Sequence, residues 1–282
     1  MRVSDLFIYP LKSARAIALP AADIDAYELP GDRRAMITDP HGHFITQREL
    51  PDLARIEIRP EAGAFRLLMQ GKPEISVPPP RPEIRMDVSV WKSTVSAAVA
   101  DAESNRQLSE WLGREVRLVF FDGQAQRTAN AEWAGEGTPV SFTDGYQILV
   151  TTTGSLRALN DDLAAHGEGS VGMERFRPNI VIDTDEAWPE DRWAALEIAG
   201  IRFDLVKPCS RCIMTTQDQL TGSREGGKPD AGYGPHPHVG RPARARPVVR
   251  LERHAARQRQ DHDRRRGPRP RRKAGGMGVE GS

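Results

Sequence analysis

The sequence is poor in cysteine and in long apolar runs. Only Cys209 and Cys212 occur in 282 residues, which excludes a small secreted scaffold held together by several disulfides. No run reaches the roughly eighteen apolar residues of a membrane-spanning helix, and residues 1–5 lack the basic start and apolar stretch of a secretory signal. We therefore expect a cytoplasmic protein that makes no use of a membrane.

The net charge of +1 is an average over two unlike parts of the chain. Residues 231–282 hold 14 Lys and Arg against 4 Asp and Glu, which leaves 26 basic and 35 acidic residues for the preceding part. The body is therefore acidic and the tail strongly basic. Because the tail has few large apolar side chains, it cannot offset the entropy lost on ordering. We predict a basic, disordered tail over residues 226–282.

Short runs typical of β-strands fill residues 1–121. Residues 34–46 read as strand, turn and strand around the turn signal Asp39-Pro40-His41-Gly42. Further strand-like runs follow at 55–59, 65–69, 74–77, 95–99 and 116–121. A helix is predicted from Ser104, with Gln107 completing a capping box, to a stop at Gly113. The pattern favours a sheet or barrel with one short helix.

A polar stretch over 122–138 marks the expected domain boundary. Beyond it we predict a helix over 152–165, where Leu156, Leu159 and Leu163 keep helical spacing. Strands are expected at 147–151, 179–183, 201–206 and 213–217. The fold class is therefore mainly β with some α, an α+β arrangement of two domains, 1–121 and 122–225, followed by the tail.

The pair Cys209 and Cys212 lies between two of these predicted strands, and its spacing leaves three interpretations open. A structural zinc site would need four ligands, and four of the seven histidines lie in the tail. A redox dithiol usually opens a helix, whereas the residues after Cys212 are not helical in pattern. A soft thiolate that binds a heavy metal needs only one cysteine and would be activated by Lys207 and Arg211.

Four blocks of sequence carry a family resemblance. They are residues 9–13 (Tyr-Pro-Leu-Lys-Ser), 31–34 (Gly-Asp-Arg-Arg), 176–181 (Phe-Arg-Pro-Asn-Ile-Val) and 207–216 (Lys-Pro-Cys-Ser-Arg-Cys-Ile-Met-Thr-Thr). Over about residues 1–225 the chain thus resembles MOSC proteins with an N-terminal β-barrel domain, a group that includes the mitochondrial amidoxime-reducing component and its bacterial relatives. The resemblance implies an N-terminal β-barrel-like domain over 1–121 and a MOSC β-barrel domain over 122–225 whose last strands are missing.

The resemblance also implies a molybdenum cofactor and the residues that hold it. Cys212 matches the cysteine that binds molybdenum, and is thereby both the metal ligand and the expected catalytic residue. The matching molybdopterin contacts are Lys12, Arg33, Arg177, Asn179, Ser210 and Arg211, with Asp144 and Tyr146 as weaker correspondences. A pterin phosphate is well served by guanidinium and hydroxyl donors. Each cation also has an ordinary interpretation as a solvated surface group, and Cys209 as a small packing residue.

The activity implied by the resemblance is reduction of N-hydroxylated small molecules, such as amidoximes, hydroxylamines or N-hydroxylated bases. Some bacterial relatives carry a ferredoxin domain, which a cysteine-rich motif would reveal, and this chain has no such motif. Electrons are therefore expected from a separate reductase or ferredoxin-like protein. The alternative is a carrier of molybdenum cofactor or of activated sulfur that turns over no substrate. The same cofactor site would serve either role.

The tail lacks the Phe-Gly-Trp-Asn segment near which MOSC proteins of this kind usually end. Back-translating residues 249–255 as GTT CGG CTG GAA CGC CAC GCN, and reading one nucleotide forward, gives Phe-Gly-Trp-Asn-Ala-Thr. We therefore hypothesise a change of reading frame, in the gene or its sequencing, between roughly Gly226 and Gly232. The competing interpretation is a basic tail that binds nucleic acid, which we do not expect because the tail has few aromatic residues for base stacking.

Overall fold

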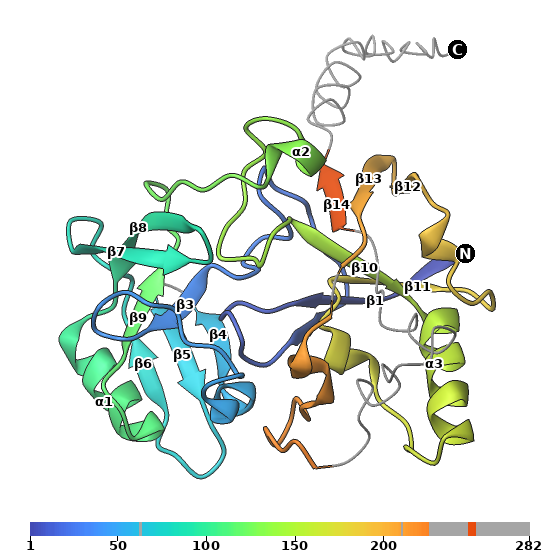
Figure 1. The fold of residues 1–282 in the computed structure, drawn as a ribbon. Helices are drawn as coiled ribbons and strands as arrows, with labels where there is room; N and C mark the ends of the chain where they lie inside the picture. Colours follow the sequence, from blue (N-terminus) through green and yellow to red (C-terminus); the bar gives the residue numbers. More distant parts are fainter. Residues whose placement is uncertain (62–63, 210, 226–247, 252–282) are drawn as a thin grey trace, which may run out of the picture.

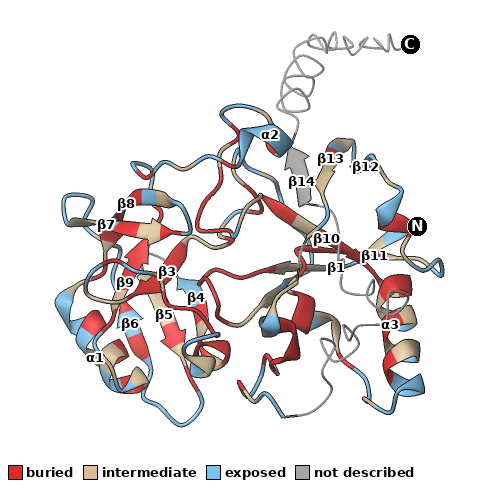
Figure 2. Ribbon diagram, in the orientation of Figure 1, coloured by how far each residue is buried: buried red, intermediate tan, exposed pale blue. Residues whose placement is uncertain are grey.

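The computed structural model describes residues 1–61, 64–209, 211–225 and 248–251. Strands dominate, and they form two sheet-based units that lie side by side (Figure 1). The mainly β class with a few helices, expected from the sequence, is confirmed. Buried residues concentrate on the strands and on the inner faces of the helices (Figure 2).

The first unit holds seven strands and one long helix. Its strands are β3 (Ala35–Thr38), β4 (Glu57–Glu61), β5 (Ala64–Leu68), β6 (Ile75–Val77), β7 (Arg85–Val90), β8 (Ser93–Val99) and β9 (Arg117–Phe120). They form two antiparallel sheets, in the orders β3-β9-β8-β7 and β4-β5-β6. Helix α1 (Ala102–Leu112) and the 3₁₀ turn η1 (Pro51–Arg55) complete the unit. One core, with Leu67, Leu108 and Leu118 fully buried, joins both sheets to α1.

The second unit is a single sheet of seven strands, flanked by helices. Its order is β12-β13-β14-β10-β11-β1-β2, and only β10 and β11 run parallel among its described pairs. The strands are β1 (Arg2–Ile8), β2 (Ile17–Leu19), β10 (Ile148–Thr152), β11 (Ile180–Asp183), β12 (Ala195–Ile198), β13 (Ile201–Lys207) and β14 (Val248–Leu251). The helices are α2 (Ala131–Ala134) and α3 (Thr153–Ala165), with 3₁₀ turns η2 (Met173–Phe176), η3 (Pro189–Asp191) and η4 (Ile213–Thr216).

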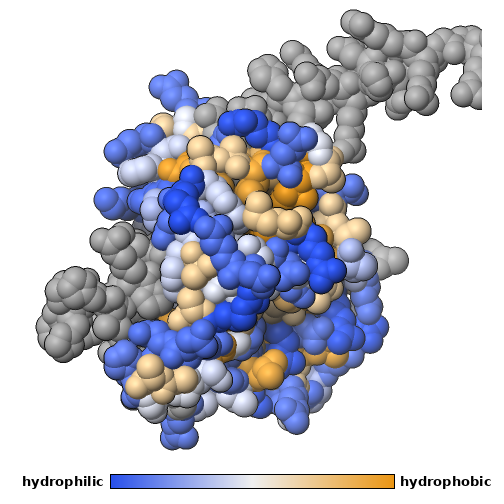
Figure 3. Space-filling model, turned by 90° about the vertical axis from the view of Figure 1, so that its right-hand side faces the viewer, coloured by the Kyte–Doolittle hydropathy of each residue, from blue (hydrophilic) through white to orange (hydrophobic). Residues whose placement is uncertain are grey.

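Strands β1 and β2 therefore lie in the sheet of the second unit, although they begin the chain. Between them the backbone crosses to the first unit, where Leu11 forms a bridge with Ala35 of β3. The residues that follow β1 are consequently held between the two units. The face of the second unit that looks to the right in Figure 1 is mostly hydrophilic, with hydrophobic areas in its upper part (Figure 3).

Three local predictions were wrong. Residues 213–217 form η4 and not a strand, because the Thr215 and Thr216 hydroxyls donate to the backbone oxygens of Cys212 (3.1 Å) and Ile213 (2.7 Å), which favours a turn. Helix α1 is capped by Asp101, whose carboxylate accepts from the Ser104 amide, so Ser104 is not the cap. Residues 43–46 make only isolated bridges after the turn. The predicted helix stop at Gly113, with φ of 65°, is confirmed.

Strand β14 lies inside the segment that the sequence assigned to a disordered tail. Its four residues pair with β10 on one side and β13 on the other, both antiparallel. For residues 248–251 the prediction of disorder is therefore wrong, and 226–247 and 252–282 lie outside the described residues. The physical reason is that a gap between two strands offers unpaired backbone donors and acceptors, which any short β-forming segment can satisfy.

Candidate functional site

A cavity of about 350 Å³ opens where the two units meet, a volume suited to a small-molecule ligand. Every sequence-predicted site residue that the structure describes lines it: Lys12, Arg33, Arg177, Asn179, Arg211 and Cys212, together with Asp144 and Tyr146. Ser210 lies outside the described residues. The cavity therefore brings together residues that are up to 200 positions apart in the chain, as from Lys12 to Cys212.

Lys12 lies in the crossing segment after β1 and is almost fully buried, with 4% of its surface exposed. Its ammonium donates to the backbone oxygen of Phe142 (2.8 Å) and to Oδ1 of Asp144 (2.5 Å). Burial lowers the pKa of Lys12, although Asp144 opposes that effect. Desolvation is the largest influence on Asp144 and acts to raise its pKa. The charge and hydrogen bond of Lys12, with the charge of Arg33 and the hydrogen bond from Trp91, together outweigh it, so the pKa is lowered. The two side chains thus form an ion pair in the cavity wall.

Arg33 is held in a left-handed backbone conformation, with φ of 44°, directly after the Gly-Asp pair. Its guanidinium donates to the Asp32 carboxylate, to Oδ1 of Asn179 (3.1 Å) and to the backbone oxygen of Arg177 (3.3 Å). Burial acts to lower the pKa of Arg33, but the fully buried Asp32 carboxylate outweighs it, so the pKa is raised. Arg33 therefore remains a fixed cation.

Arg177 ends the turn η2 with φ of 55° and continues into the residues before β11. Its Nη1 donates to the backbone oxygen of Ala14 (2.7 Å) and to Oε1 of Gln219 (3.1 Å). Burial lowers the pKa of Arg177 to about 10, which still leaves the side chain charged near neutral pH. Arg177 and Arg33 thus place two charged guanidinium groups on the same side of the cavity.

Asn179 joins these arginines to the sheet. It is 1% exposed, and its Oδ1 accepts from Arg33 and from the Leu149 amide (3.1 Å). Its Nδ2 donates to the backbone oxygen of Phe7 (3.1 Å), which lies on the neighbouring strand β1. Because its side chain bonds to the backbone of both strands, Asn179 fixes the position of Arg33 relative to β1 and β10.

Some N–H donors of the Arg211 guanidinium have no hydrogen-bond partner within the described part of the chain. Its Nη1 donates to the backbone oxygen of Phe176 (3.0 Å), and its guanidinium carbon lies 5.4 Å from the centre of the Phe176 ring. Its Nε and Nη2 are buried, yet neither has a hydrogen-bond partner among the described residues. Leaving buried charged donors unsatisfied is costly, so the arrangement suits an anionic ligand that accepts from them.

Cys212 is half-buried and directly precedes η4. Its sulfur accepts from Nη2 of Arg48 at 3.6 Å, and Arg48 reaches it from the first unit. The described residues contain no group of three or more His, Cys, Asp and Glu side chains placed to hold a metal ion. A metal at this site would therefore depend on the Cys212 thiolate and on further ligands that come with the metal.

Several residues that line the cavity were not named as candidates from the sequence, and Arg48 and Trp91 are two of them. Arg48 belongs to an ordinary polar run, and Trp91 to a hairpin turn, so neither carries a motif. The contact between Arg48 and Cys212 arises only from the packing of the two units. Nothing in the sequence pattern alone signals that contact.

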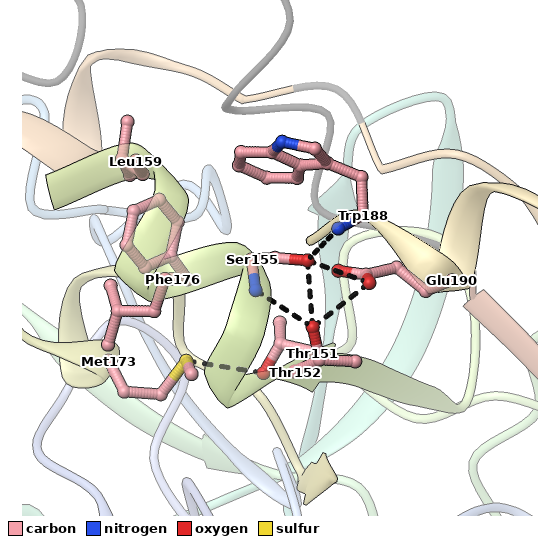
Figure 4. A pocket seen from close by; sticks show the side chains of 9 residues that line it. Thr151, Thr152, Ser155, Leu159, Met173, Phe176, Trp188 and Glu190 are labelled. Carbon is pink, nitrogen blue, oxygen red and sulfur yellow. Dashed lines mark hydrogen bonds between the residues drawn. The ribbon is translucent and has the colours of Figure 1, made fainter. Parts of the chain in front are cut away.

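A second, much smaller cavity of about 20 Å³ lies beside α3 (Figure 4). Its wall includes Glu190, whose carboxylate accepts from the Ser155 hydroxyl (2.8 Å) and lies 3.0 Å from the Thr152 hydroxyl. Trp188 covers it, and the Trp188 amide donates to the Ser155 hydroxyl (3.0 Å). That volume holds about one water molecule, so the network serves to anchor the start of α3 and not to bind a substrate.

Comparison with known families finds two matches along the chain. Residues 1–115 match the MOSC N-terminal beta barrel domain, and residues 137–249 match the MOSC domain. This chain belongs to the MOSC-domain proteins. Together the two matches include every described cavity residue named above, and the second extends into β14. No helix in the described part of this MOSC protein is both long and apolar enough to cross a membrane.

Its curated relatives are longer proteins. The chain is 28% identical to mitochondrial amidoxime-reducing component 1 of Xenopus laevis over 236 residues, which cover 78% of this chain and 66% of that protein. It is 27% identical to the molybdenum cofactor sulfurase of Homo sapiens over 242 residues, or 79% of this chain and 27% of that protein. The MOSC chain thus spans just under two thirds of the first relative and about a quarter of the second.

One solved structure, the solution structure of a protein from Bordetella bronchiseptica, is 18% identical to this MOSC protein. The alignment covers 37% of this chain and 90% of that chain, with a TM-score of 0.28. This likeness is too low to support any argument about fold or function.

Proposed function

We propose that this MOSC protein binds molybdenum cofactor in the 350 Å³ cavity and reduces N-hydroxylated small molecules. The observation that carries the proposal is the combination of one half-buried thiol, Cys212, with buried guanidinium donors of Arg211 that lack a partner among the described residues. A thiolate suits a soft metal, and the donors suit the pterin phosphate. The names of the amidoxime-reducing relatives support the choice of substrate class.

Different residues of the cavity would bind different parts of the cofactor. Cys212 would bind the molybdenum, while Lys12, Arg33, Arg177 and Arg211, aided by Asn179 and Ser210, would hold the pterin and its phosphate. The bound molybdenum centre would supply the oxygen-accepting, redox-active chemistry. The chain's own contribution is to bind, to orient and to balance charge: four cations in an otherwise acidic body offset the phosphate.

The reaction balances with an external reductant. An amidoxime takes up two electrons and two protons, its N–O bond breaks, and an amidine and one water molecule leave. The electrons would come from a separate reductase or ferredoxin-like protein. We therefore place this protein at the end of an electron-transfer chain.

The test compares two single substitutions in the same turn. Cys212→Ser should abolish both bound molybdenum, measured by elemental analysis, and amidoxime reduction with a supplied electron donor. Cys209→Ser should retain most of both, because it keeps the proposed ligand. If Cys212→Ser binds as much molybdenum as the unchanged protein, the proposal is wrong.

The relationship to molybdenum cofactor sulfurases favours one alternative, a carrier that holds cofactor or activated sulfur without reducing a substrate. A carrier would contain molybdenum yet show no amidoxime reduction with any supplied donor. Retention of metal without turnover, in the unchanged protein, would therefore decide for the carrier.

A further inference from the structure

Arg48 and Trp91 of the first unit both line the cavity. Nη2 of Arg48 lies 3.6 Å from the Cys212 sulfur, and the Arg48 guanidinium carbon lies 5.0 Å from the centre of the Trp91 ring. Both side chains line the same cavity as Cys212. Arg48 therefore contacts both that sulfur and the Trp91 ring.

Trp91 adopts a backbone conformation that tryptophan rarely takes. It is the first residue of the two-residue turn between β7 and β8, and its φ is 56°. Glycine, asparagine or aspartate is the usual residue at such a left-handed turn position. A bulky residue in a strained conformation persists only where its surroundings fix it, and such strain gathers at functional sites. The choice of tryptophan here calls for a role of the side chain.

The Trp91 indole is held by one hydrogen bond and one ring contact, and part of its surface is exposed to solvent. Its Nε1 donates to Oδ1 of Asp144 (3.2 Å), the carboxylate that also accepts from Lys12. Its ring meets the Phe44 ring edge-on, with centroids 5.1 Å apart at 61°. Even so, 44% of Trp91 is exposed, an unusual fraction for so large an apolar side chain. The ring is therefore held in place without being covered.

Arg48 has N–H donors that make no hydrogen bond among the described residues. A guanidinium carries five N–H donors, and among the described residues the Cys212 sulfur is the one acceptor that its side chain reaches. A guanidinium lying over an indole forms a flat surface on which another planar group can stack. The pair thus offers a planar platform and free donors beside the proposed metal ligand.

We propose that Arg48 and Trp91 bind the substrate and select N-hydroxylated compounds in which the group that carries the N–OH is attached to a flat aromatic ring. This inference rests on the proposed function and names the substrate class for it. The aromatic ring of the substrate stacks on the Trp91–Arg48 surface, and the N–OH oxygen accepts from the guanidinium beside Cys212. Aliphatic substrates lack the stacking contact and bind less tightly.

The test measures steady-state kinetics on benzamidoxime and acetamidoxime, using molybdenum-loaded protein and a supplied electron donor. Trp91→Gly relieves the left-handed strain and should therefore fold, but it removes the ring. It should raise KM for benzamidoxime about three- to tenfold relative to acetamidoxime, with little change in kcat. Trp91→Phe keeps an aromatic ring and should show a smaller effect. Lys92→Ala, the exposed neighbour in the same turn, is the matched control and should match the unchanged protein.

A second readout needs no turnover. Without electron donor, benzamidoxime should quench part of the tryptophan fluorescence of the loaded protein and of Lys92→Ala, but not of Trp91→Phe. Equal KM changes for both substrates in Trp91→Gly, or unaltered quenching in Trp91→Phe, would overturn the inference. If the loaded, unchanged protein reduces neither compound, the proposed function fails, while the fluorescence result still decides whether Trp91 contacts the aromatic ring.

Discussion

The guanidinium carbon of Arg177 lies 4.2 Å from the centre of the Tyr9 ring, deep in the wall of the cavity. The guanidinium carbon of Arg33 lies 4.4 Å from the centre of the same ring. The ring is 1% exposed, and its hydroxyl donates to the backbone oxygen of Pro178 (3.1 Å). Burial, the largest influence, raises the pKa of Tyr9, so the phenol stays neutral. One neutral ring thus positions two cations without neutralising them.

This relationship predicts that the ring of Tyr9 matters more than its hydroxyl. Tyr9→Leu removes both cation–ring contacts and should weaken binding of the cofactor by roughly tenfold or more, because such contacts are strongest when desolvated. Tyr9→Phe keeps the ring and should retain most of the bound molybdenum. Elemental analysis and thermal unfolding, measured on both variants, separate loss of cofactor from loss of fold. Equal molybdenum contents in two folded variants would contradict this role.

The sequence anticipated the residues that we propose to hold the cofactor, but not those that we propose to bind the substrate. Lys12, Arg33 and Arg177 lie in motif blocks, so their meeting in one cavity could be anticipated from the resemblance. Arg48 meets Cys212 across 164 positions, and only the packing of the two units creates that contact. The turn after Cys212 was missed for a different reason, since strand propensity does not reveal hydroxyl bonds to the backbone.

Glu28 makes the stability of the folded protein depend on pH. It is 0% exposed, and its pKa is raised to about 8, first by burial and then by the nearby Asp32 carboxylate, although Arg34 opposes this. The folded protein therefore keeps a proton that the unfolded chain, with an ordinary pKa of 4.5, would release. The stability contributed by this proton is fully present below about pH 4.5 and is lost as the pH rises through about 8.

Glu28→Gln, which is neutral at every pH, should remove this dependence. In the unchanged protein the unfolding free energy should fall with rising pH between about pH 5 and 8, by up to about 1.4 kcal/mol per pH unit from this group. Urea unfolding at several pH values, with the exposed Glu136→Gln as control, measures the difference between the curves. Parallel curves for Glu28→Gln and the unchanged protein would show that Glu28 does not titrate in this range.

The network in Figure 4 predicts that Glu190 stabilises the fold. Its carboxylate is the shared acceptor for the Thr152 and Ser155 hydroxyls at the start of α3. Glu190→Leu leaves the buried Ser155 hydroxyl without its acceptor and should cost about 1–3 kcal/mol, whereas Glu190→Gln keeps an acceptor and should cost less. Urea unfolding measures both, with the exposed Glu197→Ala of β12 as control. A Glu190→Leu protein as stable as Glu190→Gln would refute the anchoring role.

Strand β14 fills the gap between β10 and β13 and pairs with both strands. Ending the chain at residue 225 should leave both neighbours with unpaired edges and lower the soluble yield, while ending it at residue 252 should not. The MOSC match to residue 249 favours coding in frame through β14, whereas the Phe-Gly-Trp-Asn segment recovered one nucleotide forward favours a changed frame. The DNA decides between them: codons other than GTT CGG CTG GAA CGC CAC over residues 249–254 rule out the frame change. If those codons are present, the soluble yield of the frame-restored chain, compared with that of the unchanged chain, measures how well each sequence serves as the strand in this gap.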